Sequence, residues 1–289
     1  MKFIKCVLVS SLLMSCWIYT HIAPADNFIR PSLNFVVSLN TPASYINKNW
    51  NSFIQYLNST THYQFNLIIP RDITSLNQMI NNNEIDLIYI DSYTYFLMKQ
   101  NKKLDAIAQM RNKDASITSR SRIFVRLDSG IKTIEDLRGS SISLISPNGA
   151  GSYLAPRAFF SDHNLILEED IQVSYSGDLK KAVYDVLLNE TDAAVMCGVN
   201  YDLIIQQINM NDIFILQLTD EFPEAVIAVR ENMNAELKEN LKQAIVNMTS
   251  SYGGREALIK LRNTKIHDFV EYDENIQNQT QKLIYKARL

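Results

Sequence analysis

The chain has few of the residues that stabilise small secreted proteins through cross-links. Among its 289 residues are only three cysteines. Two of them, Cys6 and Cys16, lie in the first 25 residues, so no intramolecular disulfide can form if that segment is removed. Stability must then come from core burial, which a chain of this length can supply. The third, Cys197, has apolar neighbours that indicate a buried, unreactive thiol rather than a catalytic one.

Motifs for catalysis and cofactor binding are also missing. The chain has four histidines, and His62, His163 and His267 lie in polar stretches without the spacing of a metal site. There is no metalloprotease, nucleophile-elbow or phosphate-loop motif. The acidic runs at 168–170 and 271–274 are typical of solvated faces. The sequence therefore predicts neither an enzyme nor a cofactor.

The chain contains few glycines and prolines, and it carries no excess of positive charge. With 8 glycines and 7 prolines, the chain has no collagen-like or low-complexity stretch. The formal net charge is −3, and loss of the first 25 residues would leave 26 basic and 31 acidic residues. Because nucleic-acid-binding proteins usually carry a basic face, we expect no nucleic-acid partner.

Residues 1–25 have the three parts of a secretory signal. A basic start is followed by a short apolar core and by Ala23-Pro24-Ala25. The core is shorter than the roughly 20 residues of a membrane span. Alternatively, Leu13-Met14-Ser15-Cys16 resembles a bacterial lipobox, with lipidation at Cys16. We predict a periplasmic or other extracytoplasmic location, favouring cleavage after Ala25 over lipid anchoring and both over an uncleaved anchor.

Strand and helix patterns alternate along the rest of the chain. Apolar runs predict strands at 33–39, 65–69, 85–90, 122–126, 142–145, 171–175, 193–196, 212–216 and 225–230. Helical spacing predicts helices at 44–58, 74–80, 91 onward, 153–162, 179–188, 234–250 and 255–261, the last two separated by Gly253 and Gly254. This alternation predicts an α/β fold with mostly parallel sheets covered by helices. Two crossings, near Phe124 and Val226, predict lobe one from 31–125 plus 222–289 and lobe two from 126–221.

A glycine-rich segment between a strand and a helix is the main candidate site. Backbone amides at a helix N-terminus attract anions, and glycine lets a ligand approach the backbone closely. An ordinary tight turn is the alternative. The predicted ligand loop consists of Asn148, Gly149, Ala150, Gly151, Ser152 and Tyr153.

Further candidates lie at a strand end in lobe one and at two polar positions elsewhere. Asp91, Ser92 and Tyr93 follow a predicted strand, where open α/β sheets bind ligands. Asp91 would oppose an anion there and favour an amine or hydroxyl group. Arg122 could bind an oxyanion with both guanidinium arms, although a structural ion pair is favoured. Asp178 is a candidate ligand contact, with helix N-capping as the favoured reading.

Several blocks resemble the substrate-binding proteins of phosphonate, phosphite and phosphate ABC importers. They are 83–89, 125–130 with 137–139, and 175–177 through 192–194, and the similarity covers roughly 33–261. The resemblance implies a two-lobed periplasmic-binding-protein fold of type 2, a monomer that closes on a small-molecule ligand and delivers it to a membrane ABC permease.

The ligand loop departs from that family. Where the family typically reads Asp-Pro-Asn-Ser-Thr-Ser-Gly, this chain reads Ser-Pro-Asn-Gly-Ala-Gly-Ser over 146–152. Three hydroxyl side chains are therefore replaced by Gly149, Ala150 and Gly151. Their hydrogen bonds to a charged ligand would contribute roughly 4 to 9 kcal/mol in total.

These observations predict an exported solute-binding protein that captures a small polar ligand between its lobes. The resemblance favours a phosphonate or phosphate oxyanion and an ABC importer. Three alternatives stay open. One is a ligand-sensing input protein for a membrane receptor or kinase. Another is an enzyme on the same fold, for which the sequence offers no nucleophile or base. The third is a degenerate member that serves as an interaction protein.

Overall fold

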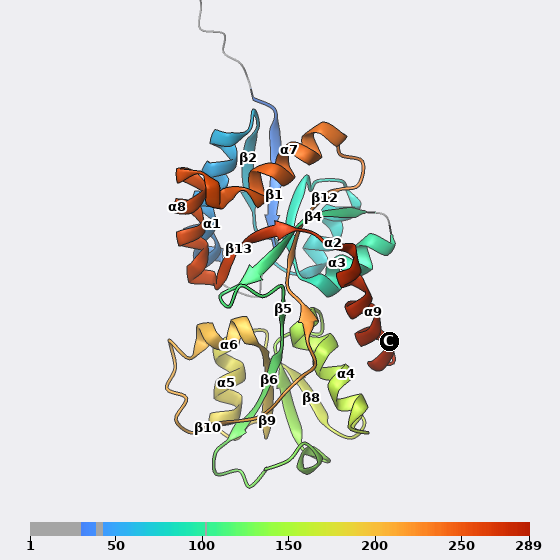
Figure 1. Cartoon of the computed structure of the whole chain (residues 1–289). Coiled ribbons are helices and arrows are strands. Elements are labelled where there is room, and N and C mark those ends of the chain that lie inside the picture. The colour runs from blue at the N-terminus through green and yellow to red at the C-terminus, as the bar shows by residue number, and fades with distance from the viewer. Residues whose placement is uncertain (1–29, 39–42, 102) are drawn as a thin grey trace, which may run out of the picture.

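The structure, a computed structural model, consists of two lobes stacked one above the other (Figure 1). It describes residues 30–38, 43–101 and 103–289. The predicted signal at 1–25, including Cys16, lies outside the described residues. Each lobe is built on its own sheet, and short strands join the two.

The lobe-one sheet has the strand order β13-β4-β12-β3-β1-β2. Its strands are β1 (Ser32–Val37), β2 (Gln64–Ile68), β3 (Leu87–Ile90), β4 (Leu104–Asn112), β12 (Val226–Arg230) and β13 (Ile266–Glu271). β2, β1 and β3 are parallel neighbours, whereas β12, β4 and β13 pair antiparallel. The sheet is therefore mixed, because β12 and β13 return to it late in the chain.

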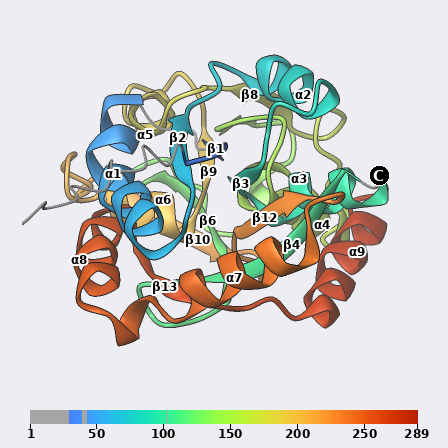
Figure 2. The same ribbon diagram turned by 90° about the horizontal axis from the view of Figure 1, so that it is seen from above.

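Helices cover both faces of this sheet. They are α1 (Ala43–Thr60), α2 (Ile73–Asn81), α3 (Ser92–Gln100), α7 (Ala235–Val246) and α8 (Tyr252–Leu261). Successive side chains of β1 point to opposite faces of the sheet. Phe35 and Val37 therefore pack with α1, α7 and α8, whereas Val36 packs with α2 and α3. From above, α1 and α8 lie together on one side, with α2 and α3 on the opposite side (Figure 2).

The lobe-two sheet has the order β10-β6-β9-β7-β8. Its strands are β6 (Ser121–Arg126), β7 (Ser141–Leu144), β8 (Gln172–Tyr175), β9 (Ala193–Cys197) and β10 (Ile213–Leu218), and its helices are α4 (Ala155–Asp162), α5 (Leu179–Leu187) and α6 (Gly198–Ile204). Ile123 and Val125 face α4, whereas Phe124 faces α5 and α6. Short helical turns complete the fold: η1 (Glu135–Leu137), η2 (Ala150–Leu154), η3 (Met248–Ser250), η4 (Arg262–Thr264) and η5 (Glu274–Ile276).

The two crossings between the lobes pair with each other. β5 (Thr118–Ser119) precedes β6, β11 (Phe222–Pro223) precedes β12, and the two strands form an antiparallel pair. We call this pair the hinge. Any relative movement of the lobes must bend at or beside it.

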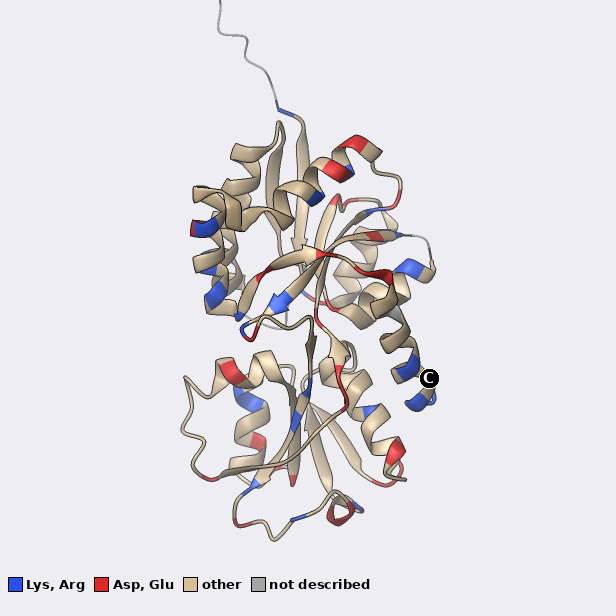
Figure 3. Cartoon of the chain, in the orientation of Figure 1, with Lys and Arg blue, Asp and Glu red and all other residues tan. Residues whose placement is uncertain are grey.

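The C-terminal helix α9 (Gln277–Lys286) runs along one flank of both lobes (Figure 1). It contacts α3 of lobe one and α4 of lobe two. Leu283 and Ala287 pack there with Leu154, Ala158 and the hinge residue Phe222. Basic residues gather near the end of α9 (Figure 3), where Lys286 pairs with Asp162 and Asp220 at 2.6 Å each.

Five of the described strands and helices were not predicted from the sequence, namely β4, β5, β11, β13 and α6, and one predicted helix break is misplaced. β4, β13 and α6 gave no clear apolar pattern, in part because β4 and β13 carry the cross-strand ion pair Arg111–Asp268. The predicted break at Gly253 and Gly254 lies instead inside the first turn of α8. A Cβ on Gly254 would lie 2.1 Å from the Met248 carbonyl oxygen, so this glycine permits close packing of α8 on η3.

Candidate functional site

A cavity of about 220 Å³ lies between the lobes and against the hinge. Lobe one contributes residues after β2 and β3, and lobe two contributes the loop after β7 and the end of β9. The hinge strand β11 and the two residues after it contribute 222–225. Carboxyl ends of parallel strands meet the start of the following helices here. This is where α/β sheets bind ligands.

The predicted ligand loop forms one wall of the cavity. Residues 146 and 148–152 line it, and Gly149 has a φ of +102°, a conformation that side chains with a Cβ rarely adopt. The loop leads into η2, a short π-helical segment, and from there into α4. The first amides of η2 have no earlier turn to bond to, and they point out of the helix end.

The glycine at 151 serves close packing rather than ligand approach. A Cβ at this position would lie 2.5 Å from both the Cys197 Cβ and the Phe222 ring. The Gly151 carbonyl also accepts a hydrogen bond from the Ser121 hydroxyl at 2.5 Å. The Ser152 hydroxyl donates to the Asn148 carbonyl at 2.5 Å. The loop is thus held in shape by its own polar groups and by the hinge.

Asp91 lies opposite this loop, at the start of α3 in lobe one. Its Oδ1 accepts hydrogen bonds from the amides of Tyr93 at 3.1 Å and Thr94 at 3.0 Å, which makes it the N-cap of α3. The same oxygen accepts a third hydrogen bond from the amide of Ala150 in lobe two, at 3.1 Å. A single carboxylate oxygen therefore joins two helix N-termini across the cleft.

Three further predicted residues hold the lobes together beside the cavity. Ser92 is buried, and its hydroxyl donates to the Pro223 carbonyl of the hinge at 2.6 Å. Tyr93 of lobe one stacks on Tyr153 of lobe two with ring centroids 6.3 Å apart. The Arg157 guanidinium lies 5.0 Å from the Tyr153 ring centroid. None of these three predicted side chains lines the described cavity, although they border its loop and helix.

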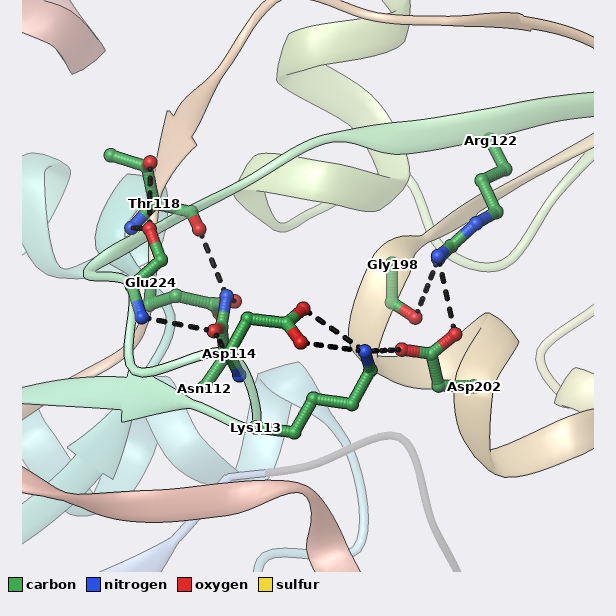
Figure 4. Close-up of polar contacts among 9 residues, drawn as sticks. Asn112, Lys113, Asp114, Thr118, Arg122, Gly198, Asp202 and Glu224 are labelled. Carbon is green, nitrogen blue, oxygen red and sulfur yellow. Dashed lines mark hydrogen bonds and ion pairs between the residues drawn. The ribbon is translucent and has the colours of Figure 1, made fainter.

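The structure places Arg122 and Asp178 away from the cavity. Arg122 borders a separate hollow on the other side of the hinge, where it donates to the Gly198 carbonyl at 2.8 Å and pairs with Asp202 at 3.2 Å (Figure 4). Lys113 from lobe one reaches the same Asp202 at 3.4 Å. Asp178 caps α5 by accepting from the amides of Lys180 and Lys181, as the favoured reading predicted.

Glu224 is a cavity residue that sequence reasoning missed. It is 7% exposed, and its carboxyl accepts from Asn112 Nδ2 at 3.1 Å (Figure 4). Burial raises the pKa of Glu224 to about 7, while hydrogen bonds from Asn112 and Ser119 oppose that rise. The sequence did contain a signal for Glu224, because it directly precedes an apolar strand. If that strand is central in the sheet, the acid beside it must lose contact with water.

Tyr89 and Cys197 complete the inner wall. Burial, with a smaller contribution from Glu224, raises the pKa of the Tyr89 hydroxyl. Cys197 is half-buried, so the prediction of a buried side chain is met only in part. Desolvation raises the pKa of its thiol to about 12, so this thiol is not an activated nucleophile.

The described ranges contain neither a metal-binding cluster nor a helix that could span a membrane. Within 30–38, 43–101 and 103–289 no three His, Cys, Asp or Glu side chains gather as a metal site would need. In the same ranges, no helix has both the length and the apolar character of a membrane span.

Comparison with known proteins places the chain in a family. The sequence model described as "ABC transporter, phosphonate, periplasmic substrate-binding protein" matches residues 35–275. PhnD1 of Prochlorococcus marinus, solved in complex with methylphosphonate, has a TM-score of 0.77 at 13% identity and covers 90% of this chain and 99% of its own. A phosphonate transporter binding protein of Pseudomonas aeruginosa has a TM-score of 0.75 at 16% identity, covering 90% and 87% respectively. At such identities the two structures establish the fold alone, and they confirm the two-lobed prediction.

One protein with a similar segment is a sensor histidine kinase. The tetrathionate sensor histidine kinase TtrS of Salmonella typhimurium is 26% identical over 114 residues, which is 38% of this chain and 19% of the kinase. The match to the phosphonate family is far longer, and the resemblance noted in the sequence is confirmed by it. The chain therefore belongs to the family of periplasmic substrate-binding proteins of phosphonate ABC transporters.

Proposed function

We propose that this protein captures a small polar ligand carrying a phosphonate-type or phosphate-type oxyanion and delivers it to a membrane ABC permease. Family membership supports the coarser part: a substrate-binding protein, a small-molecule ligand, a permease partner and an extracytoplasmic location. The observation that supports the ligand site is the cavity of about 220 Å³, whose lining includes residues at the N-termini of α3 and η2.

The chemistry of the η2 end favours an oxyanion. Amides at a helix N-terminus carry partial positive charge, and the start of η2 lies in the lining of the cavity. The first amides of α3 are already bound by Asp91. The ligand would bind through backbone amides, because the loop carries glycine and alanine where the family has hydroxyl side chains. Enclosure between the lobes would provide specificity, since a buried donor left without a partner is costly.

A thermal-shift screen of residues 26–289 tests this proposal. The panel comprises methylphosphonate, phosphate, phosphite, sulfate, amino acids, polyamines and nucleotides. A ligand at about one hundred times its dissociation constant stabilises the folded state by about 2.7 kcal/mol, which gives a shift of several degrees. We expect a shift with one oxyanion class, and no shift with any oxyanion would refute oxyanion capture.

A charge change in the loop tests where the oxyanion binds. Asn148 is half-buried and lines the cavity, so Asn148→Asp adds a negative charge beside the amides at almost constant shape. Coulomb repulsion should weaken oxyanion binding by about tenfold or more. Asn189→Asp, in an exposed turn of lobe two, is the matched control. Gly151→Val is less informative, because its side chain would collide with Phe222 and Cys197.

The match to TtrS favours a second candidate, a ligand-binding input protein for a membrane sensor. The same cavity would then report ligand occupancy to a kinase instead of a permease. Pull-down of membrane proteins with the ligand-loaded chain separates the two, since either a permease or a sensor kinase should be recovered.

A further inference from the structure

Asp91 has a contact that helix capping alone does not require. Its Oδ1 already accepts the amides of Tyr93 and Thr94, which satisfy the start of α3. The third donor, the amide of Ala150, belongs to the other lobe. This contact places a protein carboxylate on the first amide of η2.

The amide of Ala150 is the donor expected to meet an oxyanion. It follows Gly149, and a Cβ built on Gly149 would lie 3.9 Å from Asp91 Oδ1, so the carboxylate sits directly on the loop. A carboxylate and a phosphonate oxygen are both anionic acceptors, and either is stabilised by a helix N-terminus. The two cannot share one amide at hydrogen-bond distance.

The charge around the cavity strengthens this competition. Its described lining includes the acids Asp72, Asp91 and Glu224, and among those lining residues Arg71 alone is basic. The Arg71 side chain is 90% exposed and is paired with Asp72. No cation from within the cavity wall thus offsets Asp91, as far as the described residues extend.

We propose that Asp91 is an internal anion that occupies the oxyanion donor of lobe two, closes the cleft without ligand and sets the ligand preference. A carboxylate bonded to an amide forms a charge-assisted hydrogen bond, which is stronger than a neutral one. An oxyanion can bind Ala150 only after displacing Asp91, so weakly held anions are excluded. The role of Asp91 in closing the cleft does not depend on the proposed function, whereas its role in ligand preference rests on it.

Neighbouring contacts are arranged to assist this closure. Ser92 and Tyr93 directly follow Asp91 in the sequence. Tyr93 stacks on Tyr153 of η2, and the Ser92 hydroxyl donates to the Pro223 carbonyl of the hinge. They align the two helix ends, and Asp91 supplies the charged contact between them.

Two substitutions and two matched controls test the proposal. Asp91→Asn keeps an acceptable N-cap but removes the charge, and Asp91→Ala removes both. Asp178 caps α5 with the same pattern, two amides at i+2 and i+3, but touches only its own lobe. Asp178→Asn and Asp178→Ala therefore lose the same capping without affecting the cleft.

The first readout needs no ligand. Small-angle X-ray scattering of the ligand-free proteins should show a larger radius of gyration for Asp91→Ala than for wild type, and an unchanged one for Asp178→Ala. Circular dichroism verifies that each variant is folded. If the folded Asp91→Ala protein scatters as wild type does, the closure role is overturned.

The second readout is calorimetric titration with methylphosphonate and with inorganic phosphate. Loss of the competing charge-assisted bond should raise oxyanion affinity of Asp91→Asn by about tenfold to a hundredfold, with no change in Asp178→Asn. An equal or lower affinity in Asp91→Asn would overturn the role in ligand preference, a fall meaning that Asp91 itself binds the ligand. If no protein binds either anion, the proposed oxyanion capture fails, while the scattering comparison still decides whether Asp91 closes the cleft.

Discussion

Replacing Glu224 by glutamine tests how the hinge accommodates a buried acid. Glu224 directly follows β11, is 7% exposed and accepts a hydrogen bond from Asn112 Nδ2 at 3.1 Å. Burial raises its pKa from 4.5 to about 7, and the hydrogen bonds from Asn112 and Ser119 offset part of the cost of burying the charge. The acid is thus easier to bury with its proton than without it.

The sign and size of the effect follow from this shift. A rise from 4.5 to about 7 corresponds to about 3 kcal/mol between the two protonation states. Because the folded pKa is the higher one, this stability is fully present below pH 4.5 and is lost as the pH rises through about 7. Glutamine keeps the shape and cannot ionise. Glu224→Gln should therefore be more stable than wild type by about 2 to 3 kcal/mol near pH 8, and by less than about 1 kcal/mol near pH 5.

Urea unfolding of both proteins at several pH values measures this difference. The matched control is Glu221→Gln, whose side chain is 49% exposed and pairs with Arg120 on the surface. An exposed pair contributes little, so this control should track wild type at every pH. A stability difference between Glu224→Gln and wild type that does not grow with pH would refute the reasoning.

Two further predictions follow from packing. In the chain from Asp26 onward, the half-buried Cys197 thiol, with its pKa raised to about 12, should react with a disulfide reagent near pH 8 far more slowly in the native protein than in guanidinium. Equal rates would contradict the raised pKa. Leu283→Ala removes a 4% exposed side chain of α9 and should cost about 2 to 4 kcal/mol in urea unfolding. Tyr285→Ala, at an 85% exposed neighbour, should change the unfolding free energy by less than about 0.5 kcal/mol.

The sequence was informative where apolar residues follow one another along a central strand. β1, β3, β7, β9 and β12 are buried on both faces, so their apolar runs were visible without any knowledge of the fold. β4 and β13 were not, because Asp268 is buried only through its bidentate contact with Arg111. In the sequence of either strand alone, a charged residue of such a pair indicates an exposed position, because its partner is not visible.

The candidate site divides in a similar way. The loop at 148–152 could be located because glycines between a strand and a helix are a local signal. The proximity of Asp91 to Ala150 could not be predicted, since it depends on the angle between two lobes joined by short strands. Arg122 follows the alternative that the sequence favoured. Its guanidinium makes a structural ion pair with Asp202 and donates to the Gly198 carbonyl, and it does not line the cavity.

The C-terminal helix adds a third link between the lobes, besides the two hinge strands. Its chain leaves lobe one after β13, yet Leu283 and Ala287 pack with Leu154 and Ala158 of lobe two. Lys286 adds pairs to Asp162 and Asp220. If the cleft opens, α9 must separate either from α4 or from α3. Its apolar contacts and both ion pairs hold it to lobe two and the hinge, so it should stay with α4, and the segment between β13 and α9 would have to accommodate the movement. Opening is then limited by the length of that segment, and the Asp91 contact decides between the closed and the opened arrangement.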